Sequence, residues 1–179
     1  YIADWMQADM QKPALAHEIT HGLQDQHFDL KKFAASVKGE GDRQLARAAL
    51  AEGDATGVML EYVLGVDLGS VPSQILGMLR PMLQLFSSDV FNRTPRFLRD
   101  TLVFPYLSGL EFIFTMRQRL AWAKINAFYA RPPDSTEQIL HPEKYLAAEK
   151  PVPIRAKPLA ALRPAREVWT DTLGEAQIR

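Results

Sequence analysis

The sequence contains no cysteine among its 179 residues. Disulfide frameworks, cysteine-based zinc sites and a cysteine nucleophile are therefore all excluded. Any metal ion would have to be held by histidine, aspartate or glutamate. Histidine is scarce as well, with four residues in the chain, so the spacing of these four is informative. The lack of cysteine leaves the cellular compartment open, because many exported bacterial proteins also lack it.

The chain has no excess of charge of either sign, since 21 basic residues balance 21 acidic ones. That balance gives no electrostatic argument for binding to nucleic acid or to an anionic membrane surface. The sequence also lacks an apolar run long enough to span a membrane and a recognisable signal peptide. It begins at Tyr1 rather than at an initiator methionine. We expect residues 1–179 to be a single domain, shortened at both ends, of a longer or processed protein.

The two-residue alternation of β-strands is scarce, whereas helical periodicity dominates. We therefore expect a mainly α-helical fold with little or no sheet. A first helix is predicted over residues 13–26, because Pro13 suits the first turn of a helix. Its buried stripe would consist of the apolar residues that recur at every fourth position, which are Leu15, Ile19 and Leu23.

Further helices are predicted along the rest of the chain. After a connector at residues 31–41, the apolar pattern predicts a second long helix over residues 42–64, ended by Gly65. Residues 72–91 are apolar on nearly all sides, and Pro81 should kink or split a helix there. Two more helices are predicted over the ranges 95–102 and 106–130.

The last part of the chain shows a helix start and a proline-rich stretch. Ser135 and Gln138 form a capping-box pattern, which predicts a short helix near Ile139. Residues 150–168 are rich in proline and are expected to form an extended segment on the surface. Because the sequence has no internal repeat or low-complexity tract, a single domain is the simplest organisation.

The strongest chemical signal is the pentapeptide His17-Glu18-Ile19-Thr20-His21. Residues four apart on a helix share a face, so His17 and His21 can offer their imidazoles to one metal ion. Glu18 lies beside them, where its carboxylate could take a proton from water that the metal activates. Two histidines leave a catalytic zinc ion one protein ligand short.

Glu52 is the favoured third ligand. On the helix predicted over residues 42–64, it is placed at the centre of an apolar face that also includes Ala48 and Val63. A lone carboxylate is costly to ionise in such a place, and binding a metal would remove that cost. Glu61 and Asp54 are alternatives, but both are predicted to point away from the apolar face.

His27 is the fourth candidate for the third ligand. It follows His21 by six residues, which is the spacing of the third ligand in the pattern HExxHxxGxxH. That pattern requires a glycine three residues after the second histidine, and Gln24 occupies the position here. The sequence therefore favours Glu52 and leaves His27 open.

The pentapeptide, followed on a second predicted helix by Glu52-Gly53-Asp54-Ala55, resembles the gluzincin class of zinc metallopeptidases, which is thermolysin-like in its active-site logic. More narrowly, residues 17–30, 52–56 and 139–146 resemble small bacterial members of this class. The resemblance implies a compact helical, zincin-like catalytic domain in which the active-site helix packs on a second ligand helix. It also implies one zinc ion per chain and hydrolysis of peptide bonds. The sequence departs from thermolysin at Thr56, where an acid would follow the glutamate ligand by four residues.

Other residues are predicted to support the metal ligands. Asp25 follows His21 by four residues and could accept a hydrogen bond from a ligand imidazole. Gly53 and Gly57 could let the second helix approach Gly22 of the first, as a shared metal ion would require.

A peptidase of this type also needs a hydrogen-bond donor for the oxyanion that forms during the reaction. His141 and Tyr145 are the predicted catalytic donors, and Tyr106 is a further candidate. We expect the segment 135–145 to form one wall of the active-site cleft, with His141 or Tyr145 turned toward the metal.

These features together predict a zinc-dependent peptidase that acts on a peptide or protein substrate, with Glu18 as general base. Two other classes stay open: a helical module that binds zinc without catalysis, and a hydrolase of a non-peptide amide. Glu18 argues against the module, because a structural zinc site does not need that carboxylate. The sequence does not separate the amide hydrolase from the peptidase.

Overall fold

The computed structural model describes residues 8–75, 77, 93–154 and 168–179. Within these ranges the chain is mainly α-helical and contains no strand, which confirms the predicted fold class. Most of the apolar run at 72–91, including Pro81, lies outside the described residues. Of the proline-rich segment, residues 150–154 and 168 are described, and they have no regular secondary structure.

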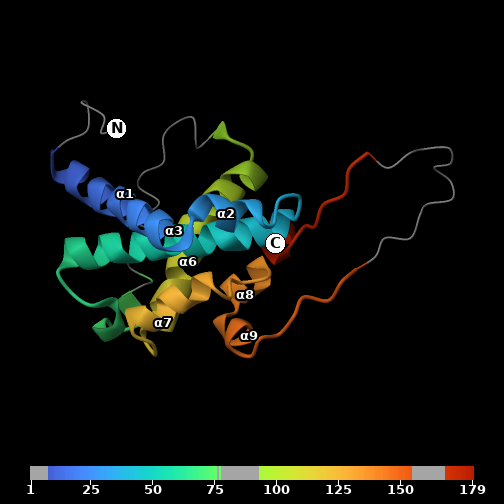
Figure 1. The fold of residues 1–179 in the computed structure, drawn as a ribbon. Helices are drawn as coiled ribbons and strands as arrows, with labels where there is room; N and C mark the ends of the chain where they lie inside the picture. Colours follow the sequence, from blue (N-terminus) through green and yellow to red (C-terminus); the bar gives the residue numbers. More distant parts are fainter. Residues whose placement is uncertain (1–7, 76, 78–92, 155–167) are drawn as a thin grey trace.

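Three long helices form the body of the fold (Figure 1). The helix α3 (Gly41–Leu64) packs against both α1 (Ala8–Phe28) and α6 (Arg96–Arg117). The shorter elements are α2 (Leu30–Ala35), η1 (Leu68–Ser70), α7 (Trp122–Asn126), η2 (Ala127–Tyr129), α8 (Thr136–Leu140), α9 (Pro142–Leu146) and α10 (Glu175–Ile178).

The second predicted helix is confirmed as α3. It ends where Gly65 takes a left-handed conformation with φ 65°, and the Gly65 N–H donates to the carbonyl of Glu61. Glycine suits this position because it has no Cβ to clash in the left-handed region. The connector predicted at 31–41 differs from the structure, because it contains most of the short helix α2.

The helices α3 and α6 approach each other closely where two glycines meet. A Cβ added to Gly53 would lie 2.2 Å from the carbonyl carbon of Gly109, and one added to Gly109 would lie 2.1 Å from the Ala49 oxygen. Gly53 therefore serves the contact with α6. The predicted role for Gly53 at Gly22 is wrong, because a Cβ on Gly22 would meet nothing within 4 Å.

Two hydrophobic clusters lie along α3 and α6. Burial of a large apolar side chain contributes about 1.5–3 kcal/mol, so these clusters are the main source of stability. The first cluster contains Ala46, Ala49, Leu50, Phe112, Ile113, Met116, Ile125, Phe128, Tyr129, Ile139 and Tyr145. The second contains Leu60, Leu68, Val71, Leu110 and Phe114.

The buried face of α1 differs from the predicted stripe. Leu15, Ile19 and Leu23 are 42%, 53% and 50% exposed, whereas Thr20 and Gln24 are 8% and 3% exposed. The helix thus turns a polar face toward the rest of the protein. Periodicity identifies an apolar stripe, but it cannot identify a polar face whose burial is made possible by hydrogen bonds.

Two prolines lie inside helices. The helix α1 contains Pro13 and begins at Ala8, upstream of the predicted start. The helix α6 continues through Pro105, where two separate helices were predicted, and ends at Arg117 before α7 begins at Trp122. A proline inside a helix costs about 3 kcal/mol or more. Pro105 is buried, so the packing of its ring opposes that cost.

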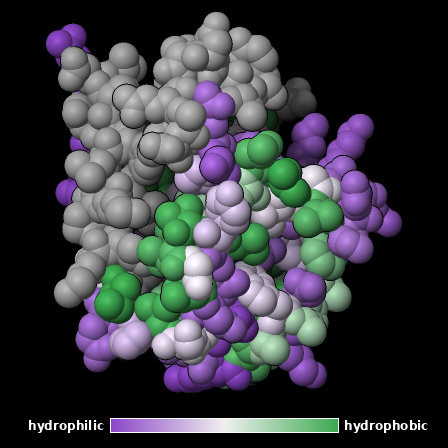
Figure 2. All heavy atoms as spheres, turned by 90° about the vertical axis from the view of Figure 1, so that its left-hand side faces the viewer, coloured by the Kyte–Doolittle hydropathy of each residue, from purple (hydrophilic) through white to green (hydrophobic). Residues whose placement is uncertain are grey.

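Figure 2 shows the face on the left of Figure 1, where hydrophobic and hydrophilic residues are mixed. The C-terminal end of α3 lies on this side, and it carries three exposed hydrophobic residues, Tyr62, Val63 and Leu64. Among the helices of the described ranges, none is both long enough and apolar enough to cross a membrane.

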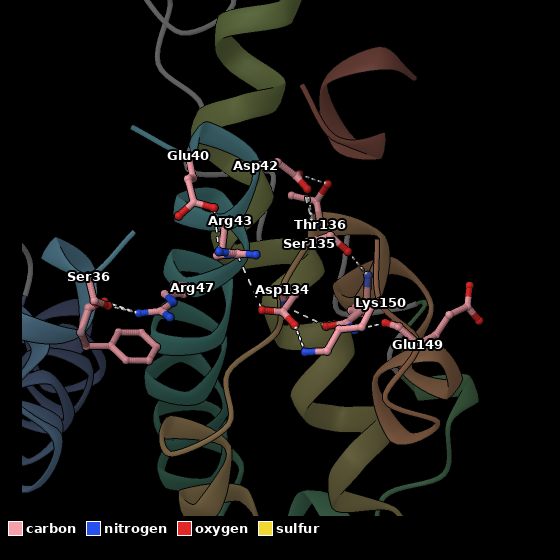
Figure 3. Close-up of polar contacts among 12 residues, drawn as sticks. Ser36, Glu40, Asp42, Arg43, Arg47, Asp134, Ser135, Thr136, Glu149 and Lys150 are labelled. Carbon is pink, nitrogen blue, oxygen red and sulfur yellow. Dashed lines mark hydrogen bonds and ion pairs between the residues drawn. The ribbon is translucent and has the colours of Figure 1, made fainter. Parts of the chain in front are cut away.

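The start of α8 is tied to the start of α3. Ser135 caps α8 by accepting a hydrogen bond from the Gln138 N–H, which confirms the predicted helix start. The Gln138 side chain accepts from the backbone N–H of Asp134. Thr136 Oγ1 donates to Asp42 Oδ1 at 2.5 Å (Figure 3). These contacts hold the segment that follows Ser135 at the N-terminal end of α3.

Candidate metal centre

Three potential ligands converge from two helices: His17 and His21 on α1, and Glu52 on α3. Their ligand atoms all lie within 4.8 Å of one another. The two histidine Nε2 atoms are 3.0 Å apart, and each lies 3.2 Å from Glu52 Oε2. The structure therefore brings together the three residues that the sequence predicts as metal ligands.

The surroundings of Glu52 are less buried than the sequence predicts. Its side chain is 24% exposed, and Ala48 and Val63, which were predicted to share its buried face, are exposed. The most buried face of α3 contains Leu50 and Gly53 and lies against α6 and the core. Glu52 instead lies where α3 meets α1, which is why it reaches both histidines.

The charges of the group favour a bound cation. Burial alone would raise the pKa of Glu52, but hydrogen bonds with His17 and His21 lower that pKa to about 2. The hydrogen bond with Glu52 likewise raises the pKa of His21, although burial opposes the change. Glu52 is therefore ionised at neutral pH, and its negative charge beside the two imidazoles favours a bound cation.

Glu18 and Tyr106 lie near the ligands. Tyr106 of α6 stacks on His17, with ring centroids 6.2 Å apart and an interplanar angle of 26°. Burial, followed by the negative charges of Glu52 and Glu18, raises the pKa of Tyr106. The Tyr106 hydroxyl therefore stays protonated at neutral pH and can donate a hydrogen bond. Glu18 is exposed on α1, directly after His17.

Comparisons with protein-family models, curated proteins and solved structures found no match. The function must therefore be inferred from the residues of the site, which is where function resides in any fold. The resemblance to the gluzincin class stays a prediction.

A chain of hydrogen bonds leads from His21 into the core. His21 Nδ1 lies 2.8 Å from Gln24 Oε1. Gln24 Nε2 donates to Asp54 Oδ2 at 2.8 Å and to the carbonyl of Ala51 at 3.1 Å. The Tyr129 hydroxyl donates to the same Asp54 oxygen at 2.8 Å.

Sequence reasoning missed this network. Asp54 was predicted to point away from the buried face of α3, yet it is 5% exposed, and burial raises its pKa. One signal was available for Gln24, which follows His21 by three residues and so shares its helix face. No local signal indicated Tyr129, because it lies far along the chain and only the fold brings it to Asp54.

Three residues considered at the sequence level have other contacts. Asp25 Oδ1 accepts from the backbone N–H of Leu30 at 3.0 Å, so it supports the turn after α1 rather than a ligand imidazole. His27 is exposed near the end of α1. Glu61 accepts from Trp122 Nε1 at 3.1 Å. None of the three belongs to the group of potential ligands found among the described residues.

The two predicted catalytic donors also have other contacts. His141 Nε2 lies 3.1 Å from Glu175 Oε1 of α10. Tyr145 is 2% exposed within the first hydrophobic cluster, and its hydroxyl donates to the carbonyl of Arg131 at 2.8 Å. These contacts direct neither side chain to the metal ligands.

The placement of the segment 135–145 has a structural reason. Hydrogen bonds attach it to Asp42, which precedes Glu52 by about 15 Å along the axis of α3. The predicted wall of the active site therefore lies at the N-terminal end of α3, whereas Glu52 lies near the middle of that helix. Of the three tyrosine and histidine donors considered, the structure brings Tyr106 to the ligands.

Proposed function

We propose that this chain is a zinc-dependent peptidase whose metal ion is held by His17, His21 and Glu52. The observation that carries the proposal is the spacing of the donor atoms. In a tetrahedral zinc site with bonds of about 2.0–2.1 Å, the donor atoms lie about 3.3 Å apart. The three separations in this protein are 3.0, 3.2 and 3.2 Å, so the donor set fits such an ion with little rearrangement.

The number and exposure of the ligands favour a catalytic site. Structural zinc sites have four protein ligands, whereas catalytic sites have three and leave a position for water or substrate. The side chains of His17, His21 and Glu52 are 13%, 23% and 24% exposed, so the group is partly open to solvent. A site of this kind supports an enzyme rather than a module that binds zinc for structure alone.

The neighbouring residues support hydrolysis of a peptide bond. When bound, zinc would polarise the scissile carbonyl and favour loss of a proton from water. Glu18, exposed beside His17, would accept that proton and deliver it to the leaving amine. Tyr106 would donate a hydrogen bond to the oxyanion that develops on the substrate.

Zinc titration of the metal-free protein, followed by assays on a peptide library, tests the proposal. We expect one zinc ion per chain and zinc-dependent cleavage. Glu18→Gln should retain zinc and lower turnover at least about a hundredfold, because it removes the proton acceptor but no ligand. Glu149→Gln is a matched control on an exposed glutamate far along the chain, and it should leave turnover unchanged.

Other results would contradict the proposal or favour one of its alternatives. A protein that binds no zinc would contradict the proposal outright. Zinc binding without hydrolysis of any peptide or amide would indicate a non-catalytic module. Cleavage of small amides but not of peptides would indicate a non-peptide amide hydrolase. Unchanged turnover in Glu18→Gln would remove Glu18 from the mechanism.

A further inference from the structure

We propose that Gln24 is a positioning residue for His21, and that Asp54 and Tyr129 hold Gln24 in place. The inference rests on the zinc centre proposed above and concerns how the chain prepares one ligand for the metal. The residues form one continuous path from the ligand imidazole to a buried tyrosine.

The orientation of the Gln24 amide is fixed by its partners. Asp54 Oδ2 and the carbonyl oxygen of Ala51 lie within 3.1 Å of one end of the amide. Both atoms accept hydrogen bonds, so the NH₂ group must occupy that end. The amide oxygen is thereby directed at His21 Nδ1, which lies 2.8 Å away.

The orientation of the amide in turn fixes the tautomer of His21. An amide oxygen can only accept a hydrogen bond, so His21 Nδ1 must carry the proton. In the neutral ring Nε2 then keeps its lone pair. Nε2 is the atom that faces His17 and Glu52, so the imidazole presents its lone pair to the position of the metal.

The far end of the path is held by stacking and hydrogen bonds. Tyr129 stacks on Phe28 with ring centroids 4.1 Å apart and an interplanar angle of 4°. Its hydroxyl and the Gln24 amide donate to the same oxygen of Asp54, which is almost fully buried. Gln24 also bonds to Ala51, the residue before Glu52, so a single side chain links both helices that supply ligands.

The test compares three variants of the full chain. Gln24→Met keeps the length of the side chain but cannot form the hydrogen bonds. Tyr129→Phe removes one hydroxyl and keeps the ring that stacks on Phe28. Gln26→Met makes the same substitution as the first variant at an exposed position of α1, and it is the matched control.

Two quantities are measured: the zinc dissociation constant, and the hydrogen exchange of the His21 Nδ1 proton in the zinc-loaded protein by NMR. We expect Gln24→Met to weaken zinc binding about ten- to a hundredfold and to speed exchange of the Nδ1 proton. Tyr129→Phe should weaken binding about two- to tenfold, since it removes one hydrogen bond farther from the metal. Gln26→Met should match the wild type in both quantities.

Circular dichroism shows whether each variant folds. If Gln24→Met does not fold, Tyr129→Phe decides the question, and a folded Tyr129→Phe with wild-type affinity and exchange would overturn the inference. Equal zinc affinity and equal Nδ1 exchange in Gln24→Met and Gln26→Met would also overturn it, while leaving the zinc centre in place. A wild-type protein that binds no zinc would instead overturn the zinc centre and this inference together.

Discussion

Gln24 of α1 and Asp54 of α3 are joined by a hydrogen bond of 2.8 Å directly behind the potential metal ligands. A polar contact of this kind is costly to bury unless each group finds a partner. Here the amide bonds to three groups and the carboxylate accepts from two. The contact between α1 and α3 is therefore organised around the Gln24 amide that bonds to His21, and the apolar stripe of α1 is exposed.

The first prediction concerns the identity of the third ligand. Glu52→Gln should weaken zinc binding by more than about a hundredfold, which exceeds the usual loss on changing a residue that only supports a ligand. His27→Ala should bind zinc like the wild type, because His27 is exposed and outside the ligand group. Competition with a chromophoric chelator measures both constants. If His27→Ala weakened zinc binding and Glu52→Gln did not, the chain would belong with enzymes that use three histidines.

The sequence was sufficient to predict the group of His17, His21 and Glu52, because each of them is indicated by a local sequence pattern. His17 and His21 share a helix face by their spacing alone. The bounds of α3 follow from an apolar pattern and from Gly65, which ends the helix. Glu52 was identified from the cost of burying a carboxylate. Its side chain is nevertheless 24% exposed, and it lies where α3 meets α1 rather than within an apolar face.

What could not be predicted depends on contacts between distant parts of the chain. Leu23 was expected inside and is half exposed, because α1 instead buries Gln24, which hydrogen-bonds to Asp54 of α3. Gly53 was assigned to the wrong neighbour, since nothing local distinguishes α1 from α6 as the helix that approaches it. His141 was selected because a peptidase needs a hydrogen-bond donor, but that need does not indicate which part of α3 the segment of His141 contacts.

The second prediction concerns the contact between α3 and α6. Gly53→Ala should lower the free energy of unfolding by about 1–3 kcal/mol or more, because its Cβ would overlap the backbone of Gly109. Gly22→Ala is a matched control on an exposed helical position with open space, and it should raise stability by about 0.5–1 kcal/mol. Urea denaturation followed by circular dichroism measures both. Equal effects of the two changes would mean that the helices do not cross at Gly53.

The third prediction is that pH acts in opposite directions on zinc affinity and on the stability of the metal-free protein. The hydrogen bond to Glu52 raises the pKa of His21 above 6.5. Zinc requires the neutral imidazole, so its affinity should fall as the pH falls through this raised pKa, with protons released on binding.

In the metal-free protein the hydrogen bond between His21 and Glu52 stabilises the fold while His21 is protonated. That contribution should be lost as the pH rises through the raised pKa of His21. The contribution of Glu52, whose pKa is lowered to about 2, should be lost as the pH falls toward that value. Zinc titrations and urea denaturation across the same pH series measure the two trends. Zinc affinity that is independent of pH near neutrality would show that His21 is not a ligand.

The fourth prediction separates two tyrosines that were both considered as oxyanion donors. Tyr106→Phe should lower turnover by about a hundredfold or more with zinc content unchanged, because it removes a donor that stacks beside the ligand His17. Tyr145→Phe should leave zinc content and turnover unchanged. It should lower the free energy of unfolding by about 1 kcal/mol, since it removes the hydrogen bond that the Tyr145 hydroxyl donates to the carbonyl of Arg131. Both variants keep an aromatic ring, so a difference in turnover reports the hydroxyl groups alone. If Tyr145→Phe were the variant that lost turnover, the segment 135–145 would have to reach the metal during the reaction, and the role assigned to Tyr106 would be wrong.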